Sequence, residues 1–66
     1  MSVGEALPSQ QARCRGILEN AVEIGHPGLF LAAMLRVSLA RAERAAVSGD
    51  VVEMIEAFQD LSTYKE

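Results

Sequence analysis

His26 and Cys14 are the first candidates for catalysis in this 66-residue chain, and each is the only residue of its type. His26 stands between Gly25 and Pro27, where a helix begins, and general acid–base catalysis needs an oriented partner for the imidazole. Cys14 falls on an apolar stripe and is expected to be a small buried side chain rather than a nucleophile. We predict that the protein is not an enzyme.

Metal-ligating side chains are too few for a zinc site, because zinc is bound by about four ligands and the soft ones here are limited to the two residues just named. Three carboxylates, those of Glu53, Glu56 and Asp60, share one side of a predicted helix. They could hold a hard cation, but the sequence lacks a turn-forming calcium loop. We expect no metal and no cofactor. The three carboxylates are either an ordinary solvated face or a candidate acidic face for a protein partner.

Charge is divided unevenly along the chain. Residues 1–49 hold five arginines against four glutamates, whereas residues 50–66 hold one lysine against five acidic residues, a balance of −4. In helix-turn-helix proteins the element after the turn meets phosphates with Lys and Arg. Here that element is the most acidic part of the chain, so we expect no direct contact with nucleic acid. A small anion remains a candidate ligand, with contacts from Arg36, Arg41 or Arg44.

The segment Ser48–Asp50 is the clearest structural signal in the sequence. Gly49 can adopt the left-handed conformation that ends a helix. Asp50 can cap the next helix, and Glu53 stands three residues further on, as in a capping box. Because apolar residues recur at helical spacing on both sides, the pattern predicts an antiparallel helical hairpin with a very short turn.

Similar signals divide the rest of the chain. Gly25 is expected to end one helix and Pro27 to open the next. Pro8 would interrupt a helix begun before it, so residues 1–8 are predicted to form a flexible lead-in. We expect one all-α domain over residues 9–66. Its three helices are predicted over about residues 10–24, 27–47 and 51–64.

Apolar residues at spacings of three and four mark the side of each helix that is expected to face the core. In the first helix they are Cys14, Ile17, Leu18, Ala21 and Ile24, with Arg13 and Arg15 on the other side. In the second helix they are Leu31, Leu35, Leu39, Ala42 and Ala46. In the third helix they are Val51, Met54, Ile55, Phe58 and Leu61, with Gln59 and Asp60 facing out.

The start of the second helix is apolar on a second side as well. The residues on that side are Phe30, Ala33, Met34 and Val37. A single core in a chain below ~70–80 residues rarely supplies more than a few kcal/mol, so small proteins often rely on self-association or a partner. Two alternatives follow. Either the first helix covers this second apolar side, or the side is the contact surface of a homo-oligomer, with a dimer as the first expectation.

The hydropathy pattern indicates no membrane span. The longest apolar run, residues 29–35, is far shorter than the ~20 residues that cross a bilayer. No basic segment precedes an apolar stretch near Met1, and a lone cysteine is typical of a reducing compartment. We expect a cytoplasmic protein that makes no membrane contact.

Three segments carry a resemblance to other proteins: Leu7–Arg13, the break Gly25–Pro27 and the turn region Ser48–Met54. Through them the chain resembles short accessory proteins carried by bacteriophages and prophages. The resemblance extends over most of the chain, and its motifs are mainly helix boundaries. It implies a small protein that binds a host protein and inhibits or modulates it, and it transfers no site residues.

Three hypotheses for function follow from these observations. The first is a non-enzymatic protein-interaction module, all-α and homo-oligomeric, that binds a protein partner. The second is a small-ligand binding protein, with an anion or nucleotide held between helices or subunits. The third is a structural subunit of a larger assembly.

Overall fold

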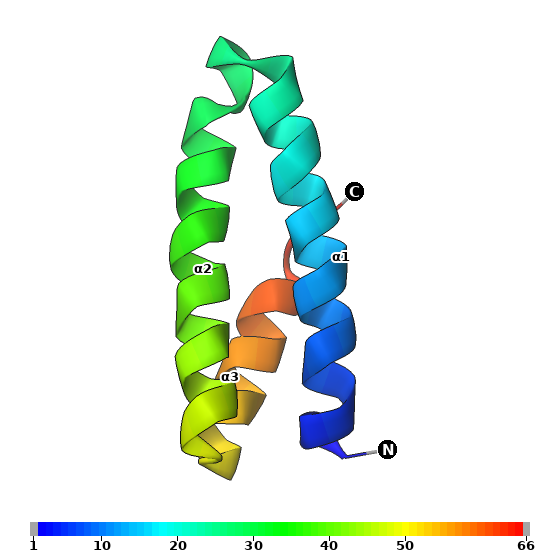
Figure 1. Ribbon diagram of the computed structural model, residues 1–66, viewed down its shortest axis with the longest axis vertical. Coiled ribbons are helices and arrows are strands. Elements are labelled where there is room, and N and C mark those ends of the chain that lie inside the picture. The colour runs from blue at the N-terminus through cyan, green and yellow to red at the C-terminus, as the bar shows by residue number, and fades with distance from the viewer. Residues whose placement is uncertain (1, 66) are drawn as a thin grey trace.

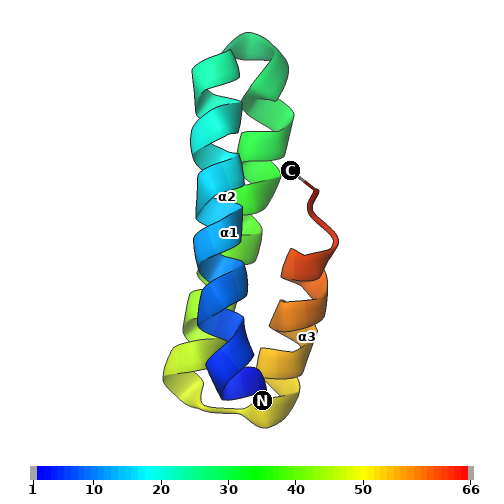
Figure 2. The same ribbon diagram turned by 90° about the vertical axis from the view of Figure 1, so that its right-hand side faces the viewer.

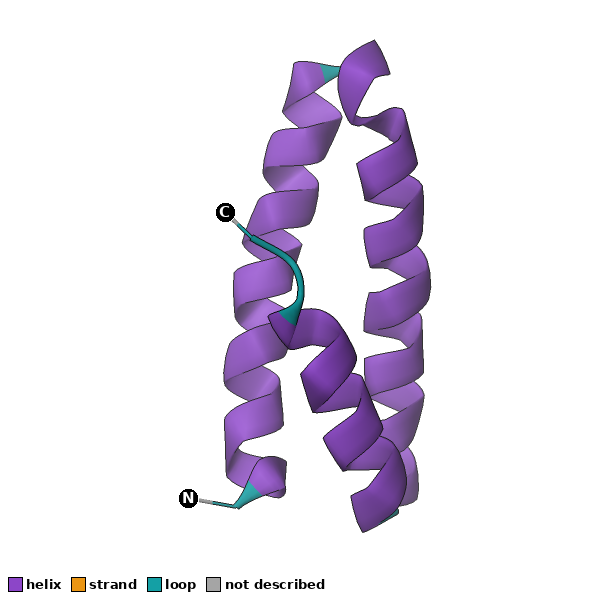
Figure 3. Cartoon of the chain, turned by 180° about the vertical axis from the view of Figure 1, so that it is seen from behind, coloured by secondary structure: helices purple, strands orange, loops and turns teal. Residues whose placement is uncertain are grey.

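The computed structural model describes residues 2–65 and shows, over this range, an all-α fold of three α-helices (Figure 1). The elements are α1 (Val3–Ile24), the short 3-10 helix η1 (His26–Gly28), α2 (Leu29–Ser48) and α3 (Val51–Ser62). The first two long helices form an antiparallel hairpin that turns at η1, and α3 folds back against both of them (Figure 2). Because α3 is short, it lies beside only the half of the hairpin that is distant from η1 (Figure 3).

The first helix begins earlier than predicted, because Pro8 lies inside α1 instead of ahead of it. The expected flexible lead-in over residues 1–8 was therefore wrong for residues 3–8, and Met1 lies outside the described residues. A proline inside a helix removes the N–H that would donate to the carbonyl four residues earlier, here that of Gly4. The proline therefore destabilises this helix, and another interaction must offset that cost.

Burial of Leu7 supplies that compensation. Leu7 is 1% exposed and belongs to the hydrophobic core, next to the proline in the sequence. Fully burying a leucine side chain stabilises a fold by about 1.5–3 kcal/mol, comparable to the cost of a proline in a helix. Tertiary packing therefore extends α1 across the proline.

The core is built from small and medium aliphatic side chains of all three helices. Its buried members are Leu7, Cys14, Ile17, Leu35, Ala42, Ala45, Ala57 and Leu61. Of the predicted inward positions, five are exposed: Ile24, Leu31, Ala46, Val51 and Ile55. On α2 the buried positions are Ala32, Leu35, Ser38, Ala42 and Ala45, because two helices pack on one side of α2 and the buried side faces between them.

The turn between α2 and α3 has the predicted geometry. Gly49 is left-handed, with φ of 72°, and the N–H of Glu53 donates to Oδ1 of Asp50 at 3.2 Å. The capping box is only half formed, since the carboxylate of Glu53 accepts from the hydroxyl of Ser48 at 3.1 Å and not from Asp50. The hydroxyl oxygen of Ser48 accepts the Asp50 N–H instead, at 3.2 Å.

The C-terminal end of α3 is held by a residue that was expected to face outward. Arg13 of α1 donates to the carbonyl oxygens of Leu61, at 2.9 Å, and Tyr64, at 2.8 Å. The phenol of Tyr64 in turn lies 2.8 Å from the hydroxyl of Ser38 on α2. These bonds tie the end of the chain to both other helices.

Candidate functional site

The second apolar side of α2 is not covered within this chain. The side chain of Phe30 is 78% exposed, that of Val37 is 61% exposed, and Ala33 and Met34 are exposed as well. The figures place α1 and α3 on the same side of α2 (Figure 1). The alternative in which the first helix covers these four residues is therefore wrong, and the predicted interface residues remain together on an open surface.

This open surface continues to the other end of α2. The buried residues Leu35 and Ala42 are seven apart and mark the inner side of the helix. Roughly opposite them run six exposed residues with spacings of three and four, which we call the outer stripe. They are Phe30, Ala33, Val37, Ala40, Arg44 and Val47.

Ala40 and Val47 were not predicted from the sequence to belong to this surface. In the structure Val47 is 84% exposed. The regular alternation of three and four is the signal that would have found them. Their inclusion turns a patch at one end of α2 into a surface that runs along nearly the whole helix.

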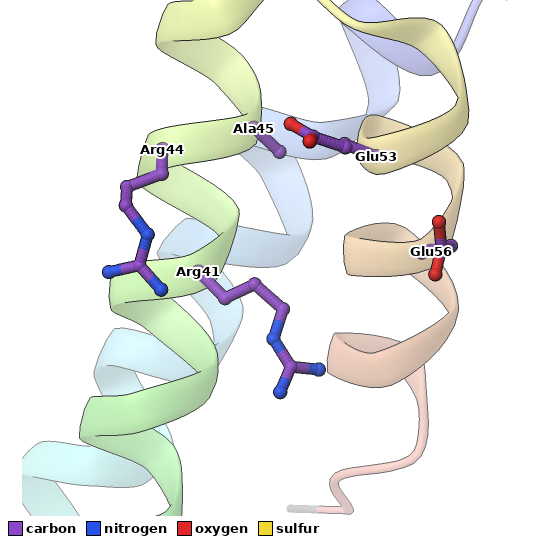
Figure 4. Close-up of a pocket in the computed structure, with 5 residues that line it drawn as sticks. All are labelled: Arg41, Arg44, Ala45, Glu53 and Glu56. Carbon is purple, nitrogen blue, oxygen red and sulfur yellow. The ribbon is translucent and has the colours of Figure 1, made fainter.

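A cleft of about 350 Å³ lies between α2 and α3 (Figure 4). Its lining residues are Arg41, Arg44, Ala45, Glu53 and Glu56. The side chain of Arg41 points across the gap toward α3, and that of Glu53 points toward α2 (Figure 4). Two of the three predicted anion contacts thus share a cleft, and Arg36 is not among its lining residues.

The formal charges of this cleft balance, since it contains two arginines and two glutamates. An anion placed there is attracted by two positive charges and repelled by two negative ones. The arrangement therefore does not favour a simple anion.

The predicted acidic face is also partly neutralised within the chain. Asp60 is half-buried instead of facing out, and its Oδ2 lies 4.0 Å from Nη1 of Arg41. Glu53 and Glu56 are exposed but line the cleft with the arginines. The three carboxylates therefore face positive charge on α2 as well as solvent.

The two candidate catalytic residues lie in different surroundings. His26 is exposed in η1, whereas Cys14 is fully buried, as predicted, and its thiol donates to the carbonyl oxygen of Leu61 at 3.5 Å. Within residues 2–65, no group of three His, Cys, Asp or Glu side chains is placed to hold a metal ion. None of the helices in that range combines the length and apolar character needed to cross a membrane.

No protein-family model, no curated protein and no solved structure matches this chain. The resemblance to phage accessory proteins therefore stays a prediction.

Proposed function

We propose that this chain is a small, non-enzymatic protein-interaction module that self-associates, as a dimer first, through the outer stripe of α2 and the adjoining Met34. The observation that supports the proposal is the exposure of apolar side chains at five of the six positions of the outer stripe, with Phe30 at its start. Scattered exposed apolar residues are ordinary, but contiguous ones mark interaction sites. Phenylalanine and methionine are also enriched in protein interfaces.

Size gives an independent reason for assembly. A core of eight buried side chains, of which three are alanines, is small even for a chain of 66 residues. Burying the outer stripe against a partner adds apolar area that the chain cannot bury alone. Folding and association are then linked, so the stability of the protein increases with its concentration.

The test is sedimentation equilibrium of the parent protein and of Val37→Glu, a change at the middle of the outer stripe. The new carboxylate would be buried in the contact, so we expect the variant to be monomeric at concentrations at which the parent is dimeric. Val52→Glu is the matched control, because Val52 on α3 is 64% exposed and Val37 is 61% exposed. The control should leave the association unchanged.

Two results would contradict the proposal. The first is a folded parent that sediments as a monomer at every accessible concentration. The second is a dimer that Val37→Glu and Phe30→Glu leave as tight as before, which would move the contact to another surface.

A further inference from the structure

The outer stripe of α2 has the spacing of a coiled-coil seam, with alternate steps of three and four residues from Phe30 to Val47. We propose that this seam packs against the same seam of a second copy, with the two α2 helices antiparallel about a two-fold axis. The inference rests on the proposed function and adds to it the identity of the partner, the orientation and the register.

The one charged residue in the stripe decides the orientation. In a parallel pair in register, Arg44 would lie against Arg44 of the second copy, and two buried like charges repel. In the antiparallel pair Arg44 lies opposite Ala33, whose small side chain leaves room for the aliphatic stem while the guanidinium reaches solvent. The other layers of the same register match Phe30 with Val47 and Val37 with Ala40.

Charge complementarity along one flank favours the same register. Arg36 and Glu43 are exposed, seven residues apart, on the flank of the stripe away from Arg41. Residues seven apart on a helix are too distant to pair with each other. Within residues 2–65 neither takes part in an ion pair. In the antiparallel dimer this flank meets its own copy, so each Arg36 lies beside Glu43 of the other copy and two ion pairs form.

The length of α2 is consistent with this register. Pairing Ala33 with Arg44 and Val37 with Ala40 places the two-fold axis between Ser38 and Leu39. That point is the middle of α2, which runs Leu29–Ser48, so the two helices overlap along their whole length. The exposed apolar residues at the start of one α2 then cover the exposed Val47 at the end of the other.

The test uses the full chain and two charge reversals, Arg36→Glu and Glu43→Arg. Each single variant replaces two ion pairs by two like-charge pairs, so we expect its dimer dissociation constant to rise about tenfold at low salt. The effect should shrink as salt is added, because these pairs are exposed. An equimolar mixture of the two variants should form heterodimers of parental affinity, since both ion pairs are then restored. Sedimentation equilibrium measures the affinities, and native mass spectrometry identifies the heterodimer.

Glu23→Arg, an exposed charge reversal on α1, is the matched control and should change neither the affinity nor the choice of partner. A parallel dimer predicts the opposite change in the dissociation constant. It would place Arg36 beside Arg41 of the second copy, so Arg36→Glu would tighten the dimer. If Val37→Glu breaks the dimer and the charge reversals change nothing, the antiparallel register is wrong and the proposed function stands. A monomeric parent overturns both.

Discussion

Gly28 packs directly against the backbone of Ala21, and the two residues are the point at which η1 meets α1. A Cβ added at Gly28 would overlap the carbonyl oxygen of Ala21 and would stand 2.9 Å from its carbonyl carbon. Real Cβ atoms do not approach backbone so closely, so only glycine allows the chain to turn this tightly from α1 into α2.

Gly28→Ala is therefore expected to destabilise the protein by about 1–3 kcal/mol, the usual cost of overpacking a site that cannot relax. Thermal or urea denaturation measures the change. Gly16→Ala on the exposed side of α1 is the control with the opposite sign, because a Cβ there meets open space and alanine is the better helix former by about 1 kcal/mol. Equal effects at both positions would show that the Gly28 contact is not tight.

Arg13→Ala should destabilise the protein by about 1–3 kcal/mol, because the carbonyl oxygens of Leu61 and Tyr64 lose a charged donor in a partly buried place. Arg13→Lys should recover only part of the loss, since an ammonium cannot reproduce the two-pronged geometry of the guanidinium. Arg15→Ala removes an exposed arginine from the same helix and should stay within about 0.5 kcal/mol of the parent. Similar losses for Arg13→Ala and Arg15→Ala would mean that the end of α3 is held by other contacts.

The turn between α2 and α3 should be sensitive to its two central residues. Asp50→Ala removes the acceptor for the Glu53 N–H and should cost about 1 kcal/mol. Gly49→Val places a β-branched residue at a φ of 72° and should cost at least as much. Denaturant titrations of both variants check these values, and unchanged midpoints would contradict the assigned cap and conformation.

The Ser38–Tyr64 bond should appear as a coupling in a double-mutant cycle. Tyr64→Phe alone leaves the buried hydroxyl of Ser38 without its 2.8 Å partner, and Ser38→Ala alone leaves the phenol without one. We expect each single variant to lose about 1 kcal/mol and the double variant to lose clearly less than the sum. Additive losses would show that the two hydroxyls do not interact in solution.

Features set by neighbouring residues could be predicted from the sequence. The all-α class, the break near Gly25 and the turn at Gly49 and Asp50 each depend on backbone preferences that act over a few residues. The apolar residues of the candidate site, Phe30 to Val37, could also be recognised, because a helix of known period has two sides and both were apolar. Backbone preferences and helical periodicity act between residues close in the sequence, so a short segment is enough to recognise them.

The tertiary structure decided which side of each helix is buried, and with it the extent of the site. On α2 the predicted inner positions Leu35 and Ala42 are buried, whereas the other three lie one position from the buried residues Ala32, Ser38 and Ala45. The inner side is set by where two other helices pack and not by α2 alone. Leu7 overrides Pro8 in the same way, because its burial depends on residues that are remote in the sequence.

Arg13 shows most clearly what the sequence leaves open. Its partner Leu61 is 48 positions away, and no local pattern distinguishes it from the exposed Arg15 on the same helix. A long polar side chain is compatible with solvent or with a distant carbonyl group, and only the packing of α3 against α1 selects between them. By itself, the sequence determined the helices and their boundaries to within a turn, except at Pro8. The folded chain determined which polar groups are bound and which apolar side of α2 stays open, because both depend on contacts between segments far apart in the chain.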